Sequence, residues 1–514
     1  MTGCYVCQSP ANLYCGKCHV AVYCSKDHQK QDWKLHKTQC SPYRICQSPT
    51  LGRYLEASRD IAAGDVILTD SPLLLGPKQV TMPVCLGCFS PVDGSYSCSQ
   101  CGWPMCSSDC EMMSLHKPEC QLSQSRSSPV QVKKFLQMNE MYECITPLRC
   151  LWLRDNEPQK WKDLMQMESH YEERKNTDIF EINQTNVAEF VQKYLFVKDF
   201  NDEEVHKICG IIDVNGFEIP GPNIVGLYGK ACLLEHSCIP NTARAYDQQL
   251  NIIVRAAVPI KKGEHLTTTY SDPMWGTTNR QYHLRTTKYF KCICSRCQDP
   301  TELGTHLSSI LCKSCSGNMI LSPSPLNPEA YVCQDCGIST SMEEADFMLK
   351  QIGERLVVLK DAPLSVSEAF LRDTSKQLSE NHYYRTDVKF AIAQMYGRKE
   401  EDIDELHKDL LDRKEQLCRD VLRLADLFSP GVTRLCGLLR FELGQCIRER
   451  YRRLPKKHKI QAPAKTLLQE AADLLKQASV VLLLESQMQD EYQLGLQAED
   501  DLEEVNKLLA KCRI

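Results

Sequence analysis

The sequence has no long apolar run and no large excess of charge of either sign. Its 514 residues include 61 Lys and Arg against 66 Asp and Glu, for a net charge of −5, so the chain has no overall attraction to nucleic acid or to an anionic membrane surface. Residues 1–7 form no apolar signal segment, and the apolar run at 478–484 is too short to span a bilayer. We therefore expect neither membrane association nor direct binding of nucleic acid.

Disulfides are not expected either, although cysteine is abundant. The chain contains 30 cysteines, and without a secretory signal they indicate a reducing compartment and metal ligation. Hydrophobic residues make up 42% of the chain and charged residues 25%, which is typical of a globular protein with a substantial core. The length predicts about three domains.

Two cysteine modules share one order of ligands and form an internal repeat. Each has two Cys-x2-Cys pairs followed by four further Cys or His residues, which makes eight ligands for two zinc ions. A module of about 40 residues cannot bury enough core to fold alone, so bound metal must supply folding energy. The ligands of the first module are Cys4, Cys7, Cys15, Cys18, Cys24, His28, His36 and Cys40. Those of the second module are Cys85, Cys88, Cys98, Cys101, Cys106, Cys110, His116 and Cys120.

Two more zinc sites are predicted downstream. Cys292, Cys294 and Cys297 supply three thiols, and a tetrahedral zinc site needs four, so we expect Cys238 to be the fourth ligand. Closing that site would bring the later segment back over Cys238. Two further Cys-x2-Cys pairs predict a zinc ribbon, with ligands Cys312, Cys315, Cys333 and Cys336. The whole set predicts six zinc ions.

The motifs between these groups resemble the SET lysine methyltransferase core. The stretch His236-Ser-Cys-Ile-Pro-Asn241 is similar to the motif Asn-His-Ser-Cys-x-Pro-Asn, and Gly263-Glu-His-Leu-Thr-Thr-Thr-Tyr270 is similar to Gly-Glu-Glu-Leu-x-x-x-Tyr. With a cysteine module between two SET segments, the chain resembles the SMYD family, in which a MYND zinc finger is inserted into the SET domain. The extra N-terminal finger and the extra cysteine pairs resemble the arthropod, SMYD-A-like branch.

The resemblance implies an α+β multidomain fold. Its parts would be a β-rich SET core split by a MYND finger, an extra N-terminal MYND finger, a zinc-bound post-SET segment and an all-α, TPR-like C-terminal domain. The expected segments are the N-terminal finger at 1–44, the first SET segment at 45–84, the inserted finger at 85–120, a helical insert at 121–210, the SET core at 211–290, the post-SET zinc site and ribbon at 291–340, and the helical C-terminal domain at 341–514.

Fingers of the MYND type cross-brace their two zinc ions, so the resemblance also implies how the ligands pair. In the first finger, one group is Cys4, Cys7, Cys24 and His28, and the other is Cys15, Cys18, His36 and Cys40. In the second finger, the groups are Cys85, Cys88, Cys106 and Cys110, and Cys98, Cys101, His116 and Cys120.

The resemblance further implies S-adenosylmethionine as the cofactor and a protein lysine as the substrate. Tyr270 matches the channel tyrosine that orients the lysine amine, although a tyrosine of the core would fit the same strand. Asn215 matches a residue near the cofactor, although it also fits an ordinary turn asparagine. The full set matched to the cofactor site is Gly52, Arg53, Tyr54, Asn215, Glu235, His236, Tyr270 and Phe290.

Two of these positions depart from the family pattern. Glu235 stands where relatives carry asparagine, and Tyr54 stands where many relatives carry a second glycine. A carboxylate cannot donate the amide hydrogen bond; at Glu235 it would either oppose the cofactor carboxylate or attract the cofactor sulfonium or ammonium.

Two functions therefore stay open. One is an S-adenosylmethionine-dependent methyltransferase of histone or non-histone lysines, acting in transcriptional regulation. The other is a catalytically weak SET and MYND scaffold or corepressor. For both, the resemblance implies docking of proline-containing peptides of regulatory proteins on the MYND fingers, and a location in the nucleus and the cytoplasm.

Overall fold

The fold is that of a computed structural model of the chain. The structure describes residues 3–16, 21–124, 126, 128–197, 199–221, 223–360, 362–398, 402–455, 458–459, 461–487 and 489–511. Cys18, a predicted ligand of the N-terminal finger, lies outside the described residues.

The strands are short and form several small sheets rather than one large one. They are β1 (Leu13–Tyr14), β2 (Val22–Tyr23), β3 (Tyr43–Ser48), β4 (Gly52–Ala57), β5 (Val66–Asp70), β6 (Pro72–Pro77), β7 (Phe217–Ile219), β8 (Ile224–Tyr228), β9 (Glu235–His236), β10 (Thr242–Tyr246), β11 (Ile252–Ala256), β12 (Thr267–Thr268), β13 (Ile310–Leu311), β14 (Asn318–Ser324), β15 (Asn327–Cys333) and β16 (Ser339–Ser341).

The helices are concentrated in the middle and at the C-terminal end of the chain. They are α1 (Lys26–Gln39), α2 (Ser108–Glu111), α3 (Lys117–Ser123), α4 (Ile145–Asn156), α5 (Pro158–Leu164), α6 (Tyr171–Arg174), α7 (Asp178–Asn183), α8 (Asp202–Asn215), α9 (Thr277–Thr287), α10 (Ser295–Gln298), α11 (Met342–Leu359), α12 (Leu364–Thr374), α13 (Tyr383–Met395), α14 (Lys408–Phe428), α15 (Arg434–Arg452), α16 (Ala462–Leu482) and α17 (Asp490–Lys511). Short helical turns are η1 (Ser114–His116), η2 (Glu140–Cys144), the π-helix η3 (Gln184–Tyr194) and η4 (Ala231–Leu233).

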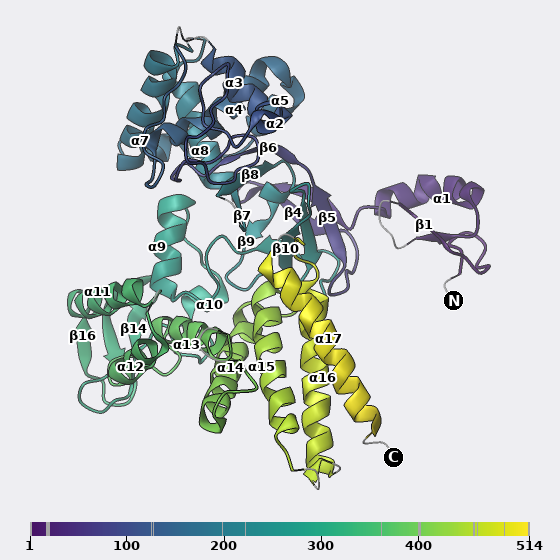
Figure 1. The fold of residues 1–514 in the computed structure, drawn as a ribbon, viewed down its shortest axis with the longest axis vertical. Coiled ribbons are helices and arrows are strands. Elements are labelled where there is room, and N and C mark those ends of the chain that lie inside the picture. Colours follow the sequence, from purple (N-terminus) through teal and green to yellow (C-terminus); the bar gives the residue numbers. More distant parts are fainter. Residues whose placement is uncertain are drawn as a thin grey trace.

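The N-terminal finger stands away from the rest of the molecule (Figure 1). Its strands β1 and β2 pair antiparallel, and α1 begins after Ser25, whose hydroxyl accepts a hydrogen bond from the His28 N–H at 3.2 Å. Such an N-cap stabilises the first helical turn. Because that turn carries His28, the cap also sets the direction of a predicted zinc ligand.

The central part contains four small sheets. Their strand orders are β10-β11-β5, β6-β8-β7, β3-β4 and the parallel pair β12-β9. Alternate residues of β11, namely Ile252, Val254 and Ala256, are completely buried, because side chains of a strand point to opposite faces in turn. The core of this region therefore lies on one face of β11, and the short pair β9–β12 lies beside it.

The second finger and helices α3–α8 form a lobe that packs on this core, which we call the upper lobe (residues 85–215; Figure 1, top). Arg149 of α4 is only 1% exposed. Its guanidinium donates to both carboxylate oxygens of Glu119 and to the carbonyls of Leu75 and Leu86, each at 2.8 Å. These bonds tie the finger, the helix and β6 together, since a buried charge is stable only when it is fully paired.

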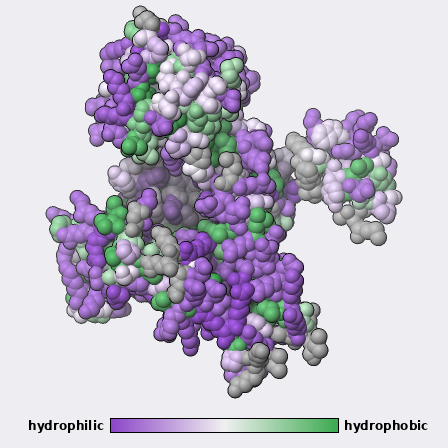
Figure 2. Space-filling model, in the orientation of Figure 1, coloured by the Kyte–Doolittle hydropathy of each residue, from purple (hydrophilic) through white to green (hydrophobic). Residues whose placement is uncertain are grey.

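The C-terminal part consists of the antiparallel sheet β13–β16 followed by helices α11–α17. Helix α15 packs closely on α16, because a Cβ at Gly437 or Gly444 would meet Val481 or Leu475 at 2.9 Å. Figure 2 shows a mostly hydrophilic surface that is hollowed between the upper lobe and the lobe carrying β13–β16. Among the described residues, none of the helices combines the length and the apolar composition that a membrane span requires. The predicted α+β architecture with a helical C-terminal region is confirmed.

Candidate active site and zinc centres

Cys238 meets three cysteines from a segment 54 or more positions later in the sequence beside the parallel pair β9–β12. The Cys238 sulfur lies 3.9 Å from that of Cys292 and 3.4 Å from that of Cys297, and with Cys294 the four sulfurs lie within 4.8 Å of one another. Thiolates bound tetrahedrally to zinc at about 2.3 Å are about 3.8 Å apart. The donor set therefore fits zinc, in a closed site of the structural type.

Buried charges behind these cysteines connect the site to the C-terminal helices. Arg280 donates to the Cys297 sulfur at 3.5 Å. Arg280 and Arg296 both pair with Glu302, at 2.7 and 3.0 Å, and none of the three side chains is more than 1% exposed. The Arg296 guanidinium also stacks 3.6 Å from the ring of Phe428 in α14. Folding of the zinc segment is thus coupled to packing of the helical domain.

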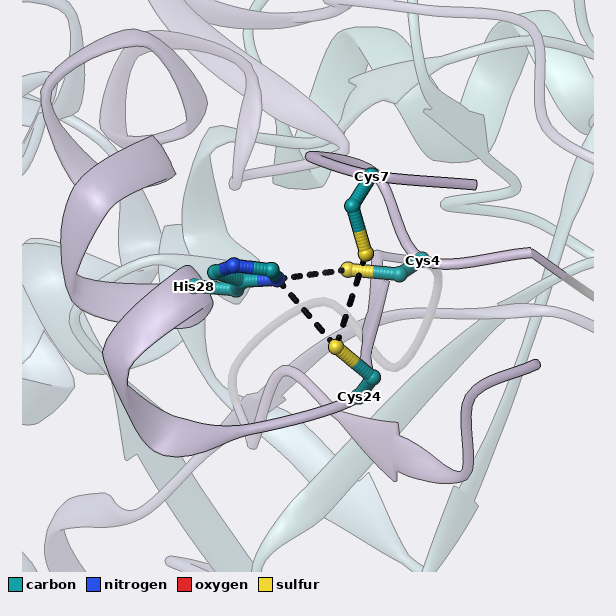
Figure 3. A group of neighbouring side chains, drawn as sticks. All are labelled: Cys4, Cys7, Cys24 and His28. Carbon is teal, nitrogen blue, oxygen red and sulfur yellow. Dashed lines mark hydrogen bonds between the residues drawn. The ribbon is translucent and has the colours of Figure 1, made fainter. Parts of the chain in front are cut away.

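The other predicted zinc ligands also gather in groups. The side chains of Cys4, Cys7, Cys24 and His28 point toward one centre (Figure 3), with 3.6 Å between the Cys7 and Cys24 sulfurs. Three more groups have their ligand atoms within 4.8 Å of one another. They are Cys85, Cys88, Cys106 and Cys110; Cys98, Cys101, His116 and Cys120; and Cys312, Cys315, Cys333 and Cys336. The cross-braced arrangement implied by the resemblance is the one that the structure brings together in the second finger.

The remaining predicted group belongs to the N-terminal finger. The sulfurs of Cys15 and Cys40 lie 3.6 Å apart, and His36 is buried with its ring centroid 6.2 Å from that of Tyr23. Cys18, the fourth member, lies outside the described residues, so its place in this group stays a prediction.

We expect six zinc ions per chain, because five groups bring four donors together at zinc-compatible spacing and the sixth holds the Cys15 and Cys40 sulfurs 3.6 Å apart. Metal analysis by mass spectrometry of protein purified without chelator should approach that number. Because zinc supplies the folding energy of such small modules, the thermal melting temperature should fall on chelation. A content of four or fewer would contradict the assignment, and the ribbon at 312–336 would then be examined first.

The parallel pair leaves one backbone edge of β9 open. Glu235 and Ser237 donate their N–H groups to the carbonyls of Leu266 and Thr268, at 3.3 and 2.9 Å. Because successive residues of a strand direct their backbone groups to opposite edges, the N–H and carbonyl of His236 point away from β12. The family resemblance implies that Glu235 and His236 form a backbone clamp on the cofactor adenine, and of these two His236 has its backbone groups on the open edge.

Tyr270 lies at the end of this strand pair, held at both its backbone and its hydroxyl. Its N–H donates to His236 Nδ1 at 3.0 Å, and its hydroxyl donates to the Leu234 carbonyl at 2.5 Å. Burial raises the pKa of the Tyr270 phenol above its ordinary value, so the hydroxyl stays protonated. The Phe290 ring stands edge-on to Tyr270, with centroids 6.4 Å apart, and lies 5.8 Å from the His236 ring. Tyr270, His236 and Phe290 thus form one aromatic wall.

Three other residues around the expected site contact the segment at 166–170. We had predicted no site residue in this segment from the sequence. Arg53 donates to the Gln166 carbonyl at 2.8 Å, and Asn215 donates to the Glu168 carbonyl at 2.8 Å. Tyr289, which precedes Phe290, packs on His170, with centroids 4.9 Å apart. The segment forms a further side of the site. Its sequence signal is weak because these contacts use mostly backbone carbonyls, which any residue type provides.

The Glu235 carboxylate has a partner that the sequence did not assign to it. Its Oε2 atom lies 2.5 Å from His265 Nδ1, and the Glu235 side chain is 16% exposed. The His265 ring stacks in turn on the ring of Tyr54, with centroids 4.4 Å apart and an interplanar angle of 28°. The two departures from the family pattern, Glu235 and Tyr54, therefore contact the same imidazole.

Lys288 is a second residue that the sequence did not single out. Its ammonium donates to the carbonyls of Asp213 and Val214, at 3.0 and 2.7 Å, and lies 5.9 Å from the centre of the Tyr270 ring. Burial lowers the pKa of Lys288 to about 8. Lys288 belongs to no recognisable sequence motif. Its position beside Tyr270 is therefore seen only in the structure.

The comparisons with known proteins agree with this geometry. The MYND finger family matches residues 4–40, and the SET domain family matches residues 52–271. The sheets, the zinc-tied segment and these matches define a SET-domain chain of the lysine methyltransferase class.

Its relatives narrow the class to a family. The SET domain-containing protein SmydA-8 of Drosophila melanogaster, isoform B, is 30% identical over 335 residues, which cover 61% of this chain and 72% of that protein. The histone-lysine N-methyltransferase ASHR1 of Arabidopsis thaliana is 25% identical over 76% of this chain and 82% of its own length. The human N-lysine methyltransferase SMYD2 is 27% identical over 49% and 59%. The chain belongs to the SMYD family, as the motifs predicted.

The site offers backbone donors and an aromatic face that fit S-adenosylmethionine. Gly52 has φ +67°, and a Cβ built there would meet nothing within 4 Å, so the turn before β4 exposes backbone to a ligand. The backbone edge of His236 and the ring of Phe290 supply polar and aromatic contacts on the other side. Gly52, His236 and Phe290 are therefore the residues that would hold the cofactor.

Proposed function

We propose that the chain is an S-adenosylmethionine-dependent protein-lysine N-methyltransferase that acts on histone or non-histone lysines in transcriptional regulation. The observation that carries the proposal is the placement of Tyr270. It ends the strand pair β9–β12, its hydroxyl is fixed on the Leu234 carbonyl, and the cysteine group around Cys238 lies next to it. Proteins of this family in other organisms bear the name N-lysine methyltransferase.

Methyl transfer requires a neutral lysine amine at a fixed distance and angle from the methyl group. When bound, S-adenosylmethionine supplies a methyl group on a sulfonium, ready for in-line displacement. Because the Tyr270 hydroxyl donates a hydrogen bond to the Leu234 carbonyl, its oxygen can still accept an N–H of the incoming amine. That contact aims the amine lone pair, and orientation of this kind contributes up to about 7–11 kcal/mol in favourable systems.

Lys288 supports the same chemistry electrostatically. Below about pH 8 its ammonium is charged, and it lies beside the Tyr270 ring. A like charge near the acceptor disfavours protonation of the substrate lysine and so lowers its pKa. The proton lost by the acceptor before transfer passes to water.

The fingers are proposed to recruit partners. MYND fingers dock proline-containing peptides, and this chain has one finger that stands clear of the core (Figure 1). We propose regulatory proteins with such peptides as partners, and a location in the nucleus and the cytoplasm.

A scaffold with weak catalysis is the second candidate. It is favoured by the Tyr54 and Glu235 side chains, which occupy positions where relatives carry glycine and asparagine. In this case the fingers and the C-terminal helices would be the functional surfaces, and the SET core would hold them together.

The proposal is tested by titrating the zinc-replete chain with S-adenosylmethionine in a calorimeter. We expect one cofactor bound per chain. A chain that carries its zinc, melts cooperatively and still binds no cofactor would refute the proposal. Binding without transfer to any lysine would favour the scaffold.

A further inference from the structure

Three residues at which this chain departs from the family motifs form one cluster. Tyr54 replaces a glycine, Glu235 replaces an asparagine, and His265 replaces the second glutamate of Gly-Glu-Glu-Leu. His265 Nδ1 lies 2.5 Å from the Glu235 carboxylate, and the His265 ring stacks on Tyr54 at 4.4 Å. Tyr54 lies at least 181 positions before Glu235 and His265 in the sequence. The fold therefore brings the three side chains together.

The strands explain why these positions meet. The chain at 264–266 runs between β4 and β9: the Leu266 N–H donates to the Leu55 carbonyl at 2.9 Å, and the Leu266 carbonyl accepts from the Glu235 N–H at 3.3 Å. His265 lies opposite Glu56 of β4, which makes Tyr54 its diagonal neighbour on the same face. A substitution at one of the three positions therefore alters the contacts of the other two side chains.

Of the side chains in this cluster, only His265 is placed to pair with the Glu235 carboxylate. The neighbouring carboxylate of Glu56 is occupied by Arg44. Tyr54 carries no charge at neutral pH, since desolvation and nearby carboxylates raise the pKa of its phenol. The Nδ1 atom of His265, whose side chain is 42% exposed, is the side-chain nitrogen that faces the Glu235 carboxylate. A mostly buried carboxylate without such a partner is strongly destabilised.

The location of Glu235 connects this pairing to the cofactor site. Glu235 is the first residue of β9, and the next residue, His236, presents the open backbone edge described above. A carboxylate turned toward that edge would bring its charge into the space that the family resemblance assigns to the cofactor adenine. Held by His265, it is directed at β4 instead.

We propose that His265 is a positioning residue for S-adenosylmethionine, acting through Glu235. The imidazole holds the Glu235 carboxylate at its Nδ1 atom and keeps it away from the backbone edge of His236, so that Glu235, His265 and Tyr54 together replace the asparagine, glutamate and glycine of the family pattern. The inference rests on the proposed function, because it concerns binding of that cofactor.

The test compares cofactor affinity in four proteins by calorimetry. His265→Phe keeps a ring on Tyr54 but leaves the Glu235 carboxylate unpaired, and we expect the Kd for S-adenosylmethionine to rise at least tenfold. Glu235→Gln combined with His265→Phe leaves no unpaired charge, and we expect the Kd to return to within threefold of wild type. Lys261→Gln is the matched control, because it breaks the exposed Lys261–Asp60 pair near the same turn and should leave the Kd unchanged.

Melting temperatures of the four proteins separate positioning from a structural role. If His265→Phe lowers the melting temperature and leaves the Kd unchanged, the pair serves stability alone and the inference is overturned. A double variant that binds no better than His265→Phe would also overturn it. If the wild-type chain itself binds no cofactor, the proposed function fails, and this inference fails with it.

Discussion

Replacing Tyr270 by phenylalanine is expected to lower turnover about 10²- to 10³-fold, the size of effect seen when one preorganised donor is removed from an active site. The phenol orients the amine only as the methyl group is transferred, so the loss should appear in kcat, with the Kd for S-adenosylmethionine changed less than threefold. The variant also leaves the Leu234 carbonyl without its donor, which costs about 1 kcal/mol of folding free energy. Single-turnover transfer of labelled methyl to a lysine substrate measures the effect.

Tyr228→Phe is the matched control for this prediction. Tyr228 is completely buried, and its hydroxyl, like that of Tyr270, donates to a backbone carbonyl, that of Leu250, at 2.6 Å. Its loss should cost similar stability and leave transfer per folded molecule unchanged. Equal activity of Tyr270→Phe and wild type would make Tyr270 an ordinary core residue.

Replacing Cys238 by serine is expected to abolish binding of S-adenosylmethionine, with the Kd at least 100-fold weaker. The cysteine group joins the segment at 292–297 to β9, and Phe290 lies two residues before Cys292, so loss of zinc releases one wall of the site. Metal analysis should show one zinc fewer, and hydrogen exchange should show lost protection at 288–298.

Cys312→Ser provides the control, because it removes one ligand of the ribbon and should also cost one zinc. The ribbon packs with α11 rather than on β9, so cofactor affinity should remain that of the wild-type chain. Unchanged affinity in Cys238→Ser would show that the site does not depend on its zinc.

Spacing and donor counting predicted the zinc groups from the sequence because ligand chemistry is local and stringent. Cys-x2-Cys pairs have few other uses in a reducing compartment, and three thiols at 292–297 required a fourth, which the structure places at Cys238. The motif around Tyr270 could also be recognised from the sequence, since the tyrosine follows a turn and a strand at a fixed spacing. The SMYD family and the α+β fold followed from these residues.

The sequence could not predict which side chains pair across strands. It suggested that the Glu235 carboxylate meets charged groups of the cofactor, because the register that brings His265 to 2.5 Å from it depends on three separate strands. Lys288 was missed for a similar reason, and the segment at 166–170 resembled a cofactor-lining helix too weakly to assign site residues. Their contacts are made through backbone carbonyls, which leave no trace in residue type.

The claim that the residues around Tyr270 form a lysine methyltransferase site is tested most directly by transfer itself. The zinc-replete chain is incubated with methyl-labelled S-adenosylmethionine and a mixture of histones and other lysine-bearing proteins, and acid hydrolysates are analysed for methyl-lysine. We predict labelled methyl-lysine with the wild-type chain and a loss of about 10²- to 10³-fold with Tyr270→Phe. Cofactor bound by the wild-type chain with no methyl-lysine formed in any protein would contradict the account.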